Sequence, residues 1–278
     1  MSIKFVVLGG DKRSLELVRL LGVDDHNVRN LVKPNSENIS FEKNEIVIGP
    51  LPFSHDNDTL NAPYYDNDLM IEDLIKLLTK DQYFFGGKIN DKYLYMAKEY
   101  RINLIDYFKR EEIQVLNAIP TAEGAIKVAM DNLLTTIHNS NVLILGYGRI
   151  GKALANLANN MGANTYVAAR SVGDLASIEN LRYYPIKLKN MDKELDQVDI
   201  IFNTIPALVL NKEYLNNLRK DTLIIDLASK PGGVDCNRAR QLGLNVNHAL
   251  GLPGKYAPVT AAKTIKETIY NIIDERGI

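Results

Sequence analysis

The stretch Val142-Leu-Ile-Leu-Gly-Tyr-Gly-Arg-Ile-Gly151 sets three glycines directly behind four apolar residues. It predicts a strand, a glycine turn and the first turn of a helix. Gly146 permits the tight turn, Gly148 lets the main chain approach a pyrophosphate where a Cβ atom would collide, and Gly151 lets the helix pack closely on the strand. The helix N-terminus offers unpaired N–H groups and the positive end of its dipole to phosphate.

A second strand is expected at residues 165–169, so strand, glycine turn, helix and strand follow one another as in a dinucleotide-binding unit. We therefore predict a Rossmann domain that binds a nicotinamide dinucleotide. The alternative is a glycine-rich turn that only packs a helix on a sheet. The residues expected to contact the cofactor are Gly146, Tyr147, Gly148, Arg149, Ile150, Gly151, Arg170, Ser171, Asn203, Thr204, Ile205 and Pro206.

The end of the second strand indicates which dinucleotide binds. Enzymes that use NAD usually place a carboxylate there for the ribose 2′-hydroxyl, whereas an arginine accommodates a 2′-phosphate. The strand ends Val167-Ala-Ala-Arg170-Ser171, with Arg170 where the acid would stand and Ser171 able to add a hydrogen bond. This pattern favours NADP, with NAD as the second choice. The alternative is that Arg170 is only a solvated residue.

Strand and helix patterns alternate in both halves of the chain, which implies parallel sheets. We predict an α/β protein of two domains, each a mainly parallel sheet with helices on both faces. A flavodoxin-like domain is expected at residues 1–119 and a Rossmann domain at residues 120–278. The expected strands are residues 3–8, 45–48, 83–85 and 102–105 in the first domain, and 142–145, 165–169, 200–203, 223–227 and 244–249 in the second.

A long helix is expected to join the two domains. Thr121 suits its N-cap, with Pro120 before it and Glu123 in the first turn, where an anion suits the helix dipole. An apolar stripe follows at helical spacing, formed by Ile126, Met130, Leu133, Leu134 and Ile137. The last helix, at residues 260–274, is expected to pack back on the N-terminal domain by analogy with other two-domain dehydrogenases.

Charge and cysteine content argue against several classes of function. The 278 residues carry a formal net charge of −1 with scattered Lys and Arg, which argues against nucleic acid as a partner. A single cysteine, Cys236, excludes an intrachain disulfide and a cysteine-based metal site. The histidines His26, His55 and His138 show no metal-ligand spacing. No stretch approaches the roughly 20 apolar residues that cross a bilayer, and no signal peptide is recognisable, so we expect a cytosolic protein.

Three loops rich in Gly and Pro follow strands of the second half, at the sheet edge where parallel sheets bind ligands. Lysines there could pair with substrate carboxylates, and an expected helix start at Gly232 and Gly233 could hold an anion. The catalytic candidates are Lys230, Lys255, Glu123 and Asn203. The substrate-binding candidates are Thr121, Ser229, Lys230, Gly232, Gly233 and Lys255.

Each of these candidates has a structural alternative. Loop lysines are usually solvated, and Asn203 could serve only to satisfy loop backbone groups. Asp226 more often anchors a turn than performs chemistry. His248, at a strand end, could act as a general acid or base, but a packed or exposed histidine is commoner.

At these loops the sequence resembles the dipicolinate synthase A subunits of spore-forming bacteria. The Asp226–Gly233 and Ala249–Lys255 strings are the most specific, because many families share the glycine motif. The resembling segments are Gly9-Gly10-Asp11, Asn117-Ala-Ile-Pro-Thr-Ala-Glu-Gly-Ala-Ile126, Val142–Gly151, Phe202-Asn-Thr-Ile-Pro-Ala207, Ile225-Asp-Leu-Ala-Ser-Lys-Pro-Gly-Gly233 and Ala249-Leu-Gly-Leu-Pro-Gly-Lys255.

The resemblance implies the formation of pyridine-2,6-dicarboxylate from the cyclic product of the condensation step of lysine biosynthesis. The net chemistry is loss of water and a two-electron oxidation, with NADP+ as acceptor. It also implies a partner, a flavoprotein-like B subunit, together with a small dicarboxylate substrate and the mother-cell cytosol of a sporulating bacterium. We further expect a homo-oligomer.

Two other functions stay open. One is a shikimate-dehydrogenase-like, NADP-dependent oxidoreductase, although the lysine and aspartate pair usual in that family is not evident. The other is a non-catalytic subunit that binds cofactor and holds a flavoprotein partner.

Overall fold

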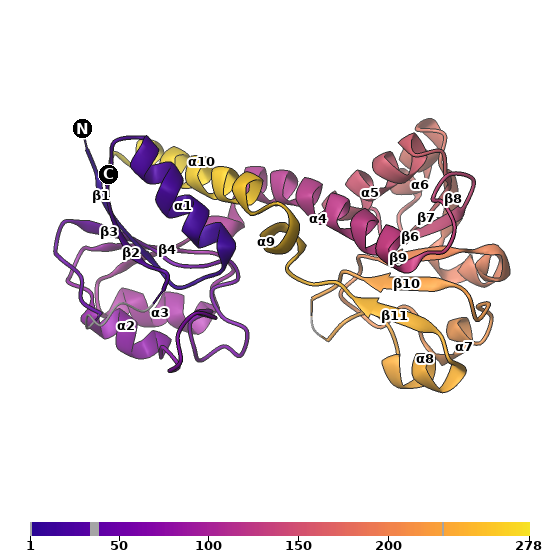
Figure 1. Ribbon diagram of the computed structural model, residues 1–278, viewed down its shortest axis with the longest axis horizontal. Coiled ribbons are helices and arrows are strands. Elements are labelled where there is room, and N and C mark those ends of the chain that lie inside the picture. The colour runs from indigo at the N-terminus through magenta and orange to yellow at the C-terminus, as the bar shows by residue number, and fades with distance from the viewer. Residues whose placement is uncertain (1, 34–38, 230) are drawn as a thin grey trace. The chain divides into compact units, whose positions relative to one another are not determined.

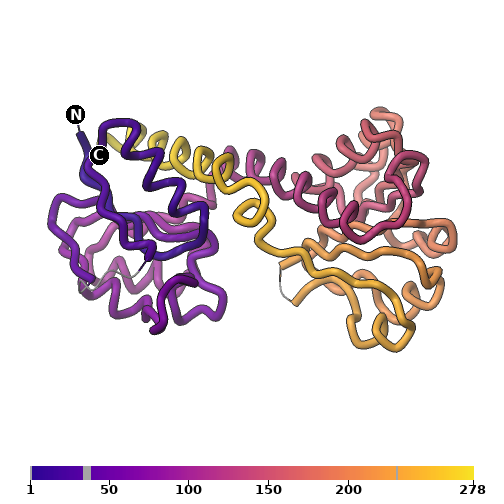
Figure 2. The backbone as a smooth tube through the Cα atoms, in the orientation of Figure 1, coloured from indigo at the N-terminus to yellow at the C-terminus, as the bar shows by residue number. Residues whose placement is uncertain are grey.

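The computed structural model describes residues 2–33, 39–229 and 231–278. The chain forms two compact units, one of Met1–Asn117 with Pro253–Ile278 and the other of Ala118–Leu252. Helix α4 (Glu111–Asn132) begins in unit 1 and continues into unit 2. Figure 2 lets the reader follow the chain through unit 2 and back into unit 1, where it ends as α10 (Pro258–Arg276).

Unit 1 is built on a five-stranded sheet in the order β2-β1-β3-β4-β5, and every strand pair is parallel. This is the flavodoxin-like order. The strands are β1 (Lys4–Leu8), β2 (Asn27–Leu31), β3 (Glu45–Ile48), β4 (Tyr83–Gly86) and β5 (Asn103–Asp106).

Helices cover both faces of this sheet because alternate strand residues point to opposite sides. In β1, Phe5 and Val7 pack with one set of helices, whereas Val6 and Leu8 pack with the other. The first set is α1 (Lys12–Val23) and α10, and the second is α2 (Ile71–Leu77) and α3 (Asp91–Glu99), as Figure 1 shows. The C-terminal helix therefore belongs to the core of unit 1.

Unit 2 contains a six-stranded sheet in the order β11-β10-β9-β6-β7-β8, again with every pair parallel. Numbered within the unit, the order is 3-2-1-4-5-6 when read from its other end, that of a Rossmann fold. The strands are β6 (Asn141–Leu145), β7 (Asn164–Ala169), β8 (Tyr184–Lys187), β9 (Ile200–Asn203), β10 (Leu223–Asp226) and β11 (Asn245–His248). The helices are α5 (Arg149–Asn160), α6 (Val172–Asn180), α7 (Lys212–Leu215) and α8 (Cys236–Leu242). The predicted fold class is confirmed.

Two strands, β2 and β8, were not expected from the sequence, and both lie at the edge of a sheet. β2 reads Asn-Val-Arg-Asn-Leu and β8 reads Tyr-Pro-Ile-Lys, with one buried side chain in each. Edge strands face solvent on one side, so they lack the apolar run that marks a central strand. Pro185 is tolerated in β8 because an edge position needs fewer ladder hydrogen bonds.

The expected start of the joining helix at Thr121 is wrong. α4 begins at Glu111, with Glu111 and Glu112 in its first turn, so Pro120 and Thr121 lie inside the helix. Acidic residues in the first turn suit the helix dipole. Glu111 and Glu112 meet this condition at the observed start just as Glu123 would at the expected start, so the rule alone does not separate the two positions. The expected apolar stripe is also partly wrong, because Met130 and Leu134 are exposed. Ile126 of this stripe is buried, and the buried residues of α4 in unit 2 also include four alanines: Ala118, Ala122, Ala125 and Ala129.

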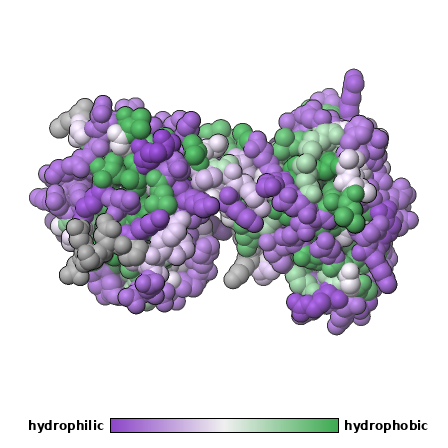
Figure 3. Space-filling model, viewed as in Figure 1, coloured by the Kyte–Doolittle hydropathy of each residue, from purple (hydrophilic) through white to green (hydrophobic). Residues whose placement is uncertain are grey.

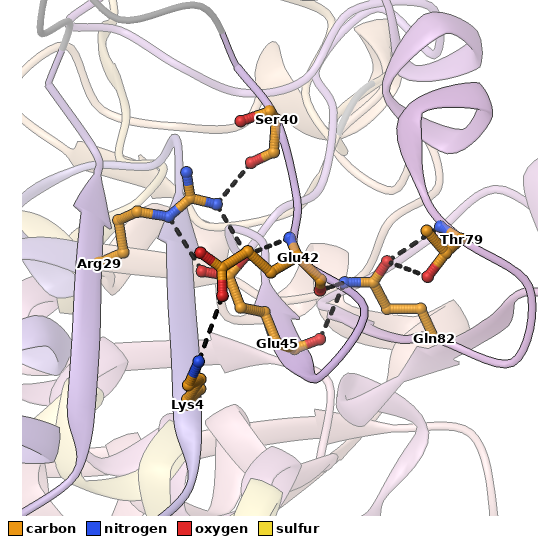
Figure 4. Close-up of polar contacts among 7 residues, drawn as sticks. All are labelled: Lys4, Arg29, Ser40, Glu42, Glu45, Thr79 and Gln82. Carbon is orange, nitrogen blue, oxygen red and sulfur yellow. Dashed lines mark hydrogen bonds and ion pairs between the residues drawn. The ribbon is translucent and has the colours of Figure 1, made fainter.

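The amino ends of the unit 1 strands hold a buried polar network, drawn in Figure 4. The Glu45 carboxylate, 6% exposed, accepts hydrogen bonds from Arg29 (2.8 Å) and from the backbone N–H of Glu42 (2.7 Å). Gln82 donates to the carbonyls of Glu42 and Glu45 at 2.9 and 3.0 Å. Ligands bind at the opposite, carboxyl edge of such sheets, so this network is structural.

The surface of each unit is mixed in hydropathy. In the view of Figure 3, most of the surface of each unit is hydrophilic, and hydrophobic side chains form only scattered patches. Among the described residues, no helix combines the length and the apolar character needed to span a bilayer.

Glu45→Ala should lower the free energy of unfolding by about 2 kcal/mol, because it leaves Arg29 without its carboxylate and the Glu42 N–H without its acceptor. Urea unfolding followed by tyrosine fluorescence measures the change. Glu72→Ala removes an exposed carboxylate that pairs with Lys76 and should change stability little. Equal effects of the two substitutions would contradict a structural role for the network.

Candidate functional site

The loops that follow β6 and β9 lie side by side at the carboxyl edge of the unit 2 sheet. Their strands pair directly, and this pair is the point where the strand order reverses. Thr204 ties the two loops together, because its N–H and its hydroxyl both donate to the carbonyl of Leu145, at 3.0 and 2.8 Å. Open α/β sheets bind ligands in the crevice at such a point.

The three glycines of the first loop meet different surroundings. Gly146 has φ +99°, and a Cβ atom there would lie 2.6 Å from the Thr204 hydroxyl. A Cβ atom on Gly151 would collide with the carbonyl of Gly146. Gly148 differs: its φ is −80°, and no described atom lies within 4 Å of the place of a Cβ atom. The protein's own packing therefore explains the first two glycines and leaves the third unexplained.

Helix α5 starts at this loop without a side-chain cap. Gly148 is its N-cap residue and has no side chain to accept the first N–H groups. The helix has 12 residues, and Gly151, Leu154, Ala155 and Ala158 fix one of its faces in the core. Its N-terminus is thus firmly placed at the end of β6 and presents main-chain donors to the crevice.

Arg170 and Ser171 directly follow the last residue of β7. The Arg170 side chain is exposed and makes no hydrogen bond or ion pair with the part of the chain that the structure describes. Ser171 is the N-cap of α6, where its hydroxyl accepts from the N–H of Asp174 at 3.0 Å. The two residues therefore differ. The Arg170 guanidinium has no partner among the described residues, whereas the Ser171 hydroxyl caps the N-terminus of α6.

The side chain of Asn203 is committed to the loops around it. It is fully buried, and its amide nitrogen donates to Asp226 (2.8 Å) and to the carbonyl of Ile205 (3.1 Å). Its amide oxygen accepts from the N–H of Ile205 at 3.1 Å. Both amide hydrogens have protein partners, so the geometry gives Asn203 the scaffolding role that was its structural alternative.

Asp226 is the centre of this network. It is fully buried, and its carboxylate accepts from Asn203, from the N–H of Ala228 (3.1 Å) and from the N–H of Gly233 (3.0 Å). A buried carboxylate is costly unless such donors surround it. The loops after β9 and β10 are therefore held to each other through one side chain.

The expectation that Gly232 and Gly233 begin a helix with free N–H groups is wrong. Helix α8 begins at Cys236 with Asp235 as its N-cap. The N–H of Gly232 donates to Ser229 and that of Gly233 to Asp226. Gly232 has φ +87°, and Gly233 packs so closely on Asn203 that a Cβ atom would collide with it. These glycines serve a tight turn, which the sequence pattern does not distinguish from a helix start.

Two further residues, His248 and Cys236, are connected to Asp226; the sequence offers His248 as a general acid or base and gives Cys236 no role at this site. His248 Nδ1 lies 3.4 Å from the Asp226 carboxylate, and His248 Nε2 lies 3.0 Å from Cys236 Sγ. Burial, followed by the charges of Asp226 and Asp235, raises the pKa of the Cys236 thiol. The sequence could have indicated one of these two contacts. Asp226 and His248 end two neighbouring parallel strands, β10 and β11, and are register partners there.

The remaining candidates come from α4, from the loop after β10 and from the segment that follows β11. Lys230 lies outside the described residues, and Ser229 before it is exposed. Lys255 is exposed on α9 (Leu252–Tyr256), and its Pro253–Ile278 segment belongs to unit 1. In α4, Thr121 is buried at 8% exposure and Glu123 is exposed. Of the described substrate candidates, Ser229, Gly232 and Gly233 thus share one loop of unit 2, Thr121 lies in α4, and Lys255 belongs to unit 1.

This arrangement is suited to hold a diphosphate by main-chain donors. No group of three or more His, Cys, Asp or Glu residues that could hold a metal ion is present among the residues described. The groups at this edge of the sheet include backbone N–H groups, the exposed guanidinium groups of Arg149 and Arg170, and the Asp226–His248–Cys236 contacts.

Comparison with known families divides the chain in a similar way. Residues 4–108 match the family described as the N-terminal domain of the dipicolinate synthase A subunit. Residues 113–231 match the family described as D-isomer specific 2-hydroxyacid dehydrogenase, NAD binding domain. The second unit thus carries an NAD-binding domain of a dehydrogenase family, which supports an oxidoreductase-type role.

Individual relatives match nearly the whole chain. The A subunit of dipicolinate synthase from Bacillus subtilis (strain 168) is 32% identical over 286 residues, 98% of this chain and 96% of that protein. The crystal structure of the Bacillus subtilis protein has a TM-score of 0.86 at 30% identity and covers 99% of this chain and 97% of its own. That of the dipicolinate synthase A subunit from Bacillus halodurans has a TM-score of 0.85 at 30% identity, over 98% and 97%. This chain belongs to the family of dipicolinate synthase A subunits.

Proposed function

We propose that this chain is the A subunit of a dipicolinate synthase and that it oxidises a cyclic, partly reduced pyridine dicarboxylate with a nicotinamide dinucleotide held in unit 2. The observation that carries the proposal is the open space at Gly148. A glycine there relieves no strain, because its φ is −80°, and it avoids no protein atom. A ligand that approaches the main chain supplies the reason for a glycine.

The other cofactor residues fit this placement. The uncapped start of α5 would hold the pyrophosphate, with Tyr147 beside it at 9% exposure. Thr204, Ile205 and Pro206 line the neighbouring loop and would face the nicotinamide end. When bound, the oxidised nicotinamide supplies a hydride acceptor. The role of the chain is to orient the ring and to exclude water from it.

Arg170 supports NADP as the cofactor. A guanidinium with no protein partner among the described residues, at the end of the second Rossmann strand, suits a 2′-phosphate, and a carboxylate that would prefer a 2′-hydroxyl is absent from that position. Ser171 is engaged as a helix cap and would add little. NAD is the second choice.

The substrate candidates carry charges that suit a dicarboxylate. Lys255 is exposed in the segment that leads into α10 of unit 1, and Lys230 follows Ser229 in the sequence. We propose both lysines as carboxylate partners, with Ser229 as a neighbouring hydrogen-bonding residue. Thr121 and Glu123 lie inside α4, so neither is a helix-start anion site, and Glu123 stays an exposed candidate base.

The name of the Bacillus subtilis relative, which calls it one subunit of a synthase, motivates the partner in this proposal. We propose a second, flavoprotein-like B subunit that works with this chain in the mother-cell cytosol of a sporulating bacterium. A homo-oligomer of this chain is part of the same proposal.

Gly148→Ala should weaken binding of NADPH about tenfold or more, because the new methyl group occupies the space left for the pyrophosphate. Calorimetric titration measures the affinity, and the thermal midpoint should stay unchanged. Gly173→Ala in α6 is the matched control, since a Cβ atom there also meets nothing within 4 Å. Equal affinity of wild type and Gly148→Ala would place the phosphates elsewhere.

Arg170→Gln should weaken the binding of NADPH about tenfold and leave the binding of NADH nearly unchanged. Only NADPH has a 2′-phosphate that forms a charge-assisted hydrogen bond with Arg170, and the substitution removes this bond. Parallel titrations with both dinucleotides measure the difference. Tighter binding of NADH than NADPH by the wild-type chain would remove the argument for NADP.

Purified full-length chain should produce pyridine-2,6-dicarboxylate from the cyclic dihydropyridine substrate and NADP+, followed by absorbance of NADPH. Addition of the B subunit should raise the rate or leave it unchanged. Product only in the presence of the partner would identify a cofactor-binding subunit without its own activity. Turnover of shikimate alone would replace the proposal by a shikimate-dehydrogenase-like activity.

A further inference from the structure

Unit 1 contains a buried arginine that the proposed cofactor chemistry does not use. Arg13 lies in the first turn of α1, directly beyond the carboxyl end of β1, and is 6% exposed. Burying a guanidinium is costly unless its N–H groups find acceptors. The partners of Arg13 therefore indicate what the side chain is for.

Part of the guanidinium is held by the protein. Nε donates to the Asp11 carboxylate at 2.9 Å, and Nη2 donates to the same carboxylate at 2.8 Å. Nη2 also donates to the carbonyl of Leu51. These contacts fix the plane of the guanidinium between the loops that follow β1 and β3.

The third nitrogen, Nη1, makes no hydrogen bond with any described residue. No side-chain nitrogen or oxygen of the described residues is both fully buried and unpaired. Nη1 is therefore the side of the Arg13 guanidinium that reaches the surface. A rigidly held guanidinium with one open nitrogen is prepared to donate to an oxygen ligand.

The position of this nitrogen in the fold is that of a ligand site. β1 and β3 are neighbours in the order β2-β1-β3-β4-β5, and the strand order reverses between them. Flavodoxin-like sheets bind ligands at this point, outside the carboxyl ends of the strands. Arg13 contacts the loops of both strands through Asp11 and Leu51.

The C-terminal segment comes to the same place. A Cβ atom on Gly254 would collide with the Asp11 carboxylate and would lie 2.9 Å from Arg13 Nε. The next residue, Lys255, is exposed. The Gly-Lys pair of the Ala249–Lys255 string thus has a structural explanation: the glycine lets α9 approach the Asp11–Arg13 pair, and the lysine directly follows that contact in the sequence.

Charge decides the kind of ligand. Burial raises the pKa of Asp11, but hydrogen bonds and charge from Arg13 outweigh it and hold that pKa below its usual value. Asp11 is therefore ionised at neutral pH and orients Arg13 without accepting a proton. A hydrogen bond from the open Nη1 to a carboxylate oxygen is charge-assisted, so it is stronger than one to a neutral acceptor.

We propose that Arg13 binds one carboxylate of a small carboxylic acid substrate through Nη1, at the β1–β3 switch point of unit 1. The inference rests on the proposed function, because it assigns a residue of unit 1 to the dicarboxylate. Arg13 is a binding residue here, and Asp11 is its positioning residue.

The test compares two ligands that differ by one carboxylate, pyridine-2,6-dicarboxylate and pyridine-2-carboxylate, titrated into the full-length chain. Arg13→Gln removes the guanidinium, and Arg13→Lys keeps a charge that can still pair with Asp11 if the first variant fails to fold. Arg19→Gln is the matched control, since Arg19 lies on the same helix and pairs with Glu16. Thermal midpoints and NADP+ affinity are measured for each variant.

Wild type and Arg19→Gln should bind the dicarboxylate about tenfold tighter than the monocarboxylate, and Arg13→Gln should bind the two alike. Arg13→Lys should fall between them. NADP+ affinity should stay constant throughout, because that site lies in unit 2.

A tenfold ratio that persists in both Arg13 variants would overturn the proposal and leave a purely structural ion pair, whatever the change in thermal midpoint. Absence of binding of both acids to the wild type would also overturn it. Loss of the proposed function itself has a separate signature, which is failure of the wild-type chain to bind either dinucleotide.

Discussion

The contact of Gly151 with the carbonyl of Gly146 leaves no space for a side chain, and it sets the geometry of the whole Rossmann unit. The helix after β6 can start directly at the strand end only because of this close approach. Its N-terminus then points into the crevice between the loops of β6 and β9, where Gly148 keeps the main chain bare. A larger residue at either end of the turn would move the donors of α5 away from any phosphate.

A second constraint works through a side chain. The buried Asp226 carboxylate accepts hydrogen bonds from the side chain of Asn203 and from the backbone N–H groups of Ala228 and Gly233. An unpaired carboxylate at this depth would be strongly unfavourable, so the two loops cannot separate without a large cost. The loops after β9 and β10 are therefore held together by this network, and the Asn203 side chain is committed to it.

The sequence predicts those features that depend on local chemistry. The glycine motif and the β9 and β10 strands follow from residue type and spacing, and the structure contains them. The start of α4 could not be placed, because Pro120 looks like a helix boundary but is accommodated inside the helix. The contact of His248 with Asp226 follows from the pairing of two consecutive parallel strands, which the alternating pattern could have indicated. The contact of His248 with Cys236 depends on how α8 packs at the strand end, which spacing along the chain does not give.

The same topological rule governs both units, but the two switch points carry different chemistry. In unit 2 the point between β6 and β9 offers main-chain N–H groups and a space without side chains, which suits a diphosphate whose charge is spread over many oxygens. In unit 1 the point between β1 and β3 offers one guanidinium whose orientation Asp11 and Leu51 fix. One guanidinium nitrogen held in a fixed orientation suits the compact charge of a carboxylate better than that of a diphosphate, and the ionised Asp11 beside it disfavours a dianionic phosphate. This difference is the physical basis for our proposal that unit 2 holds the cofactor and that Arg13 of unit 1 holds a carboxylate of the acid.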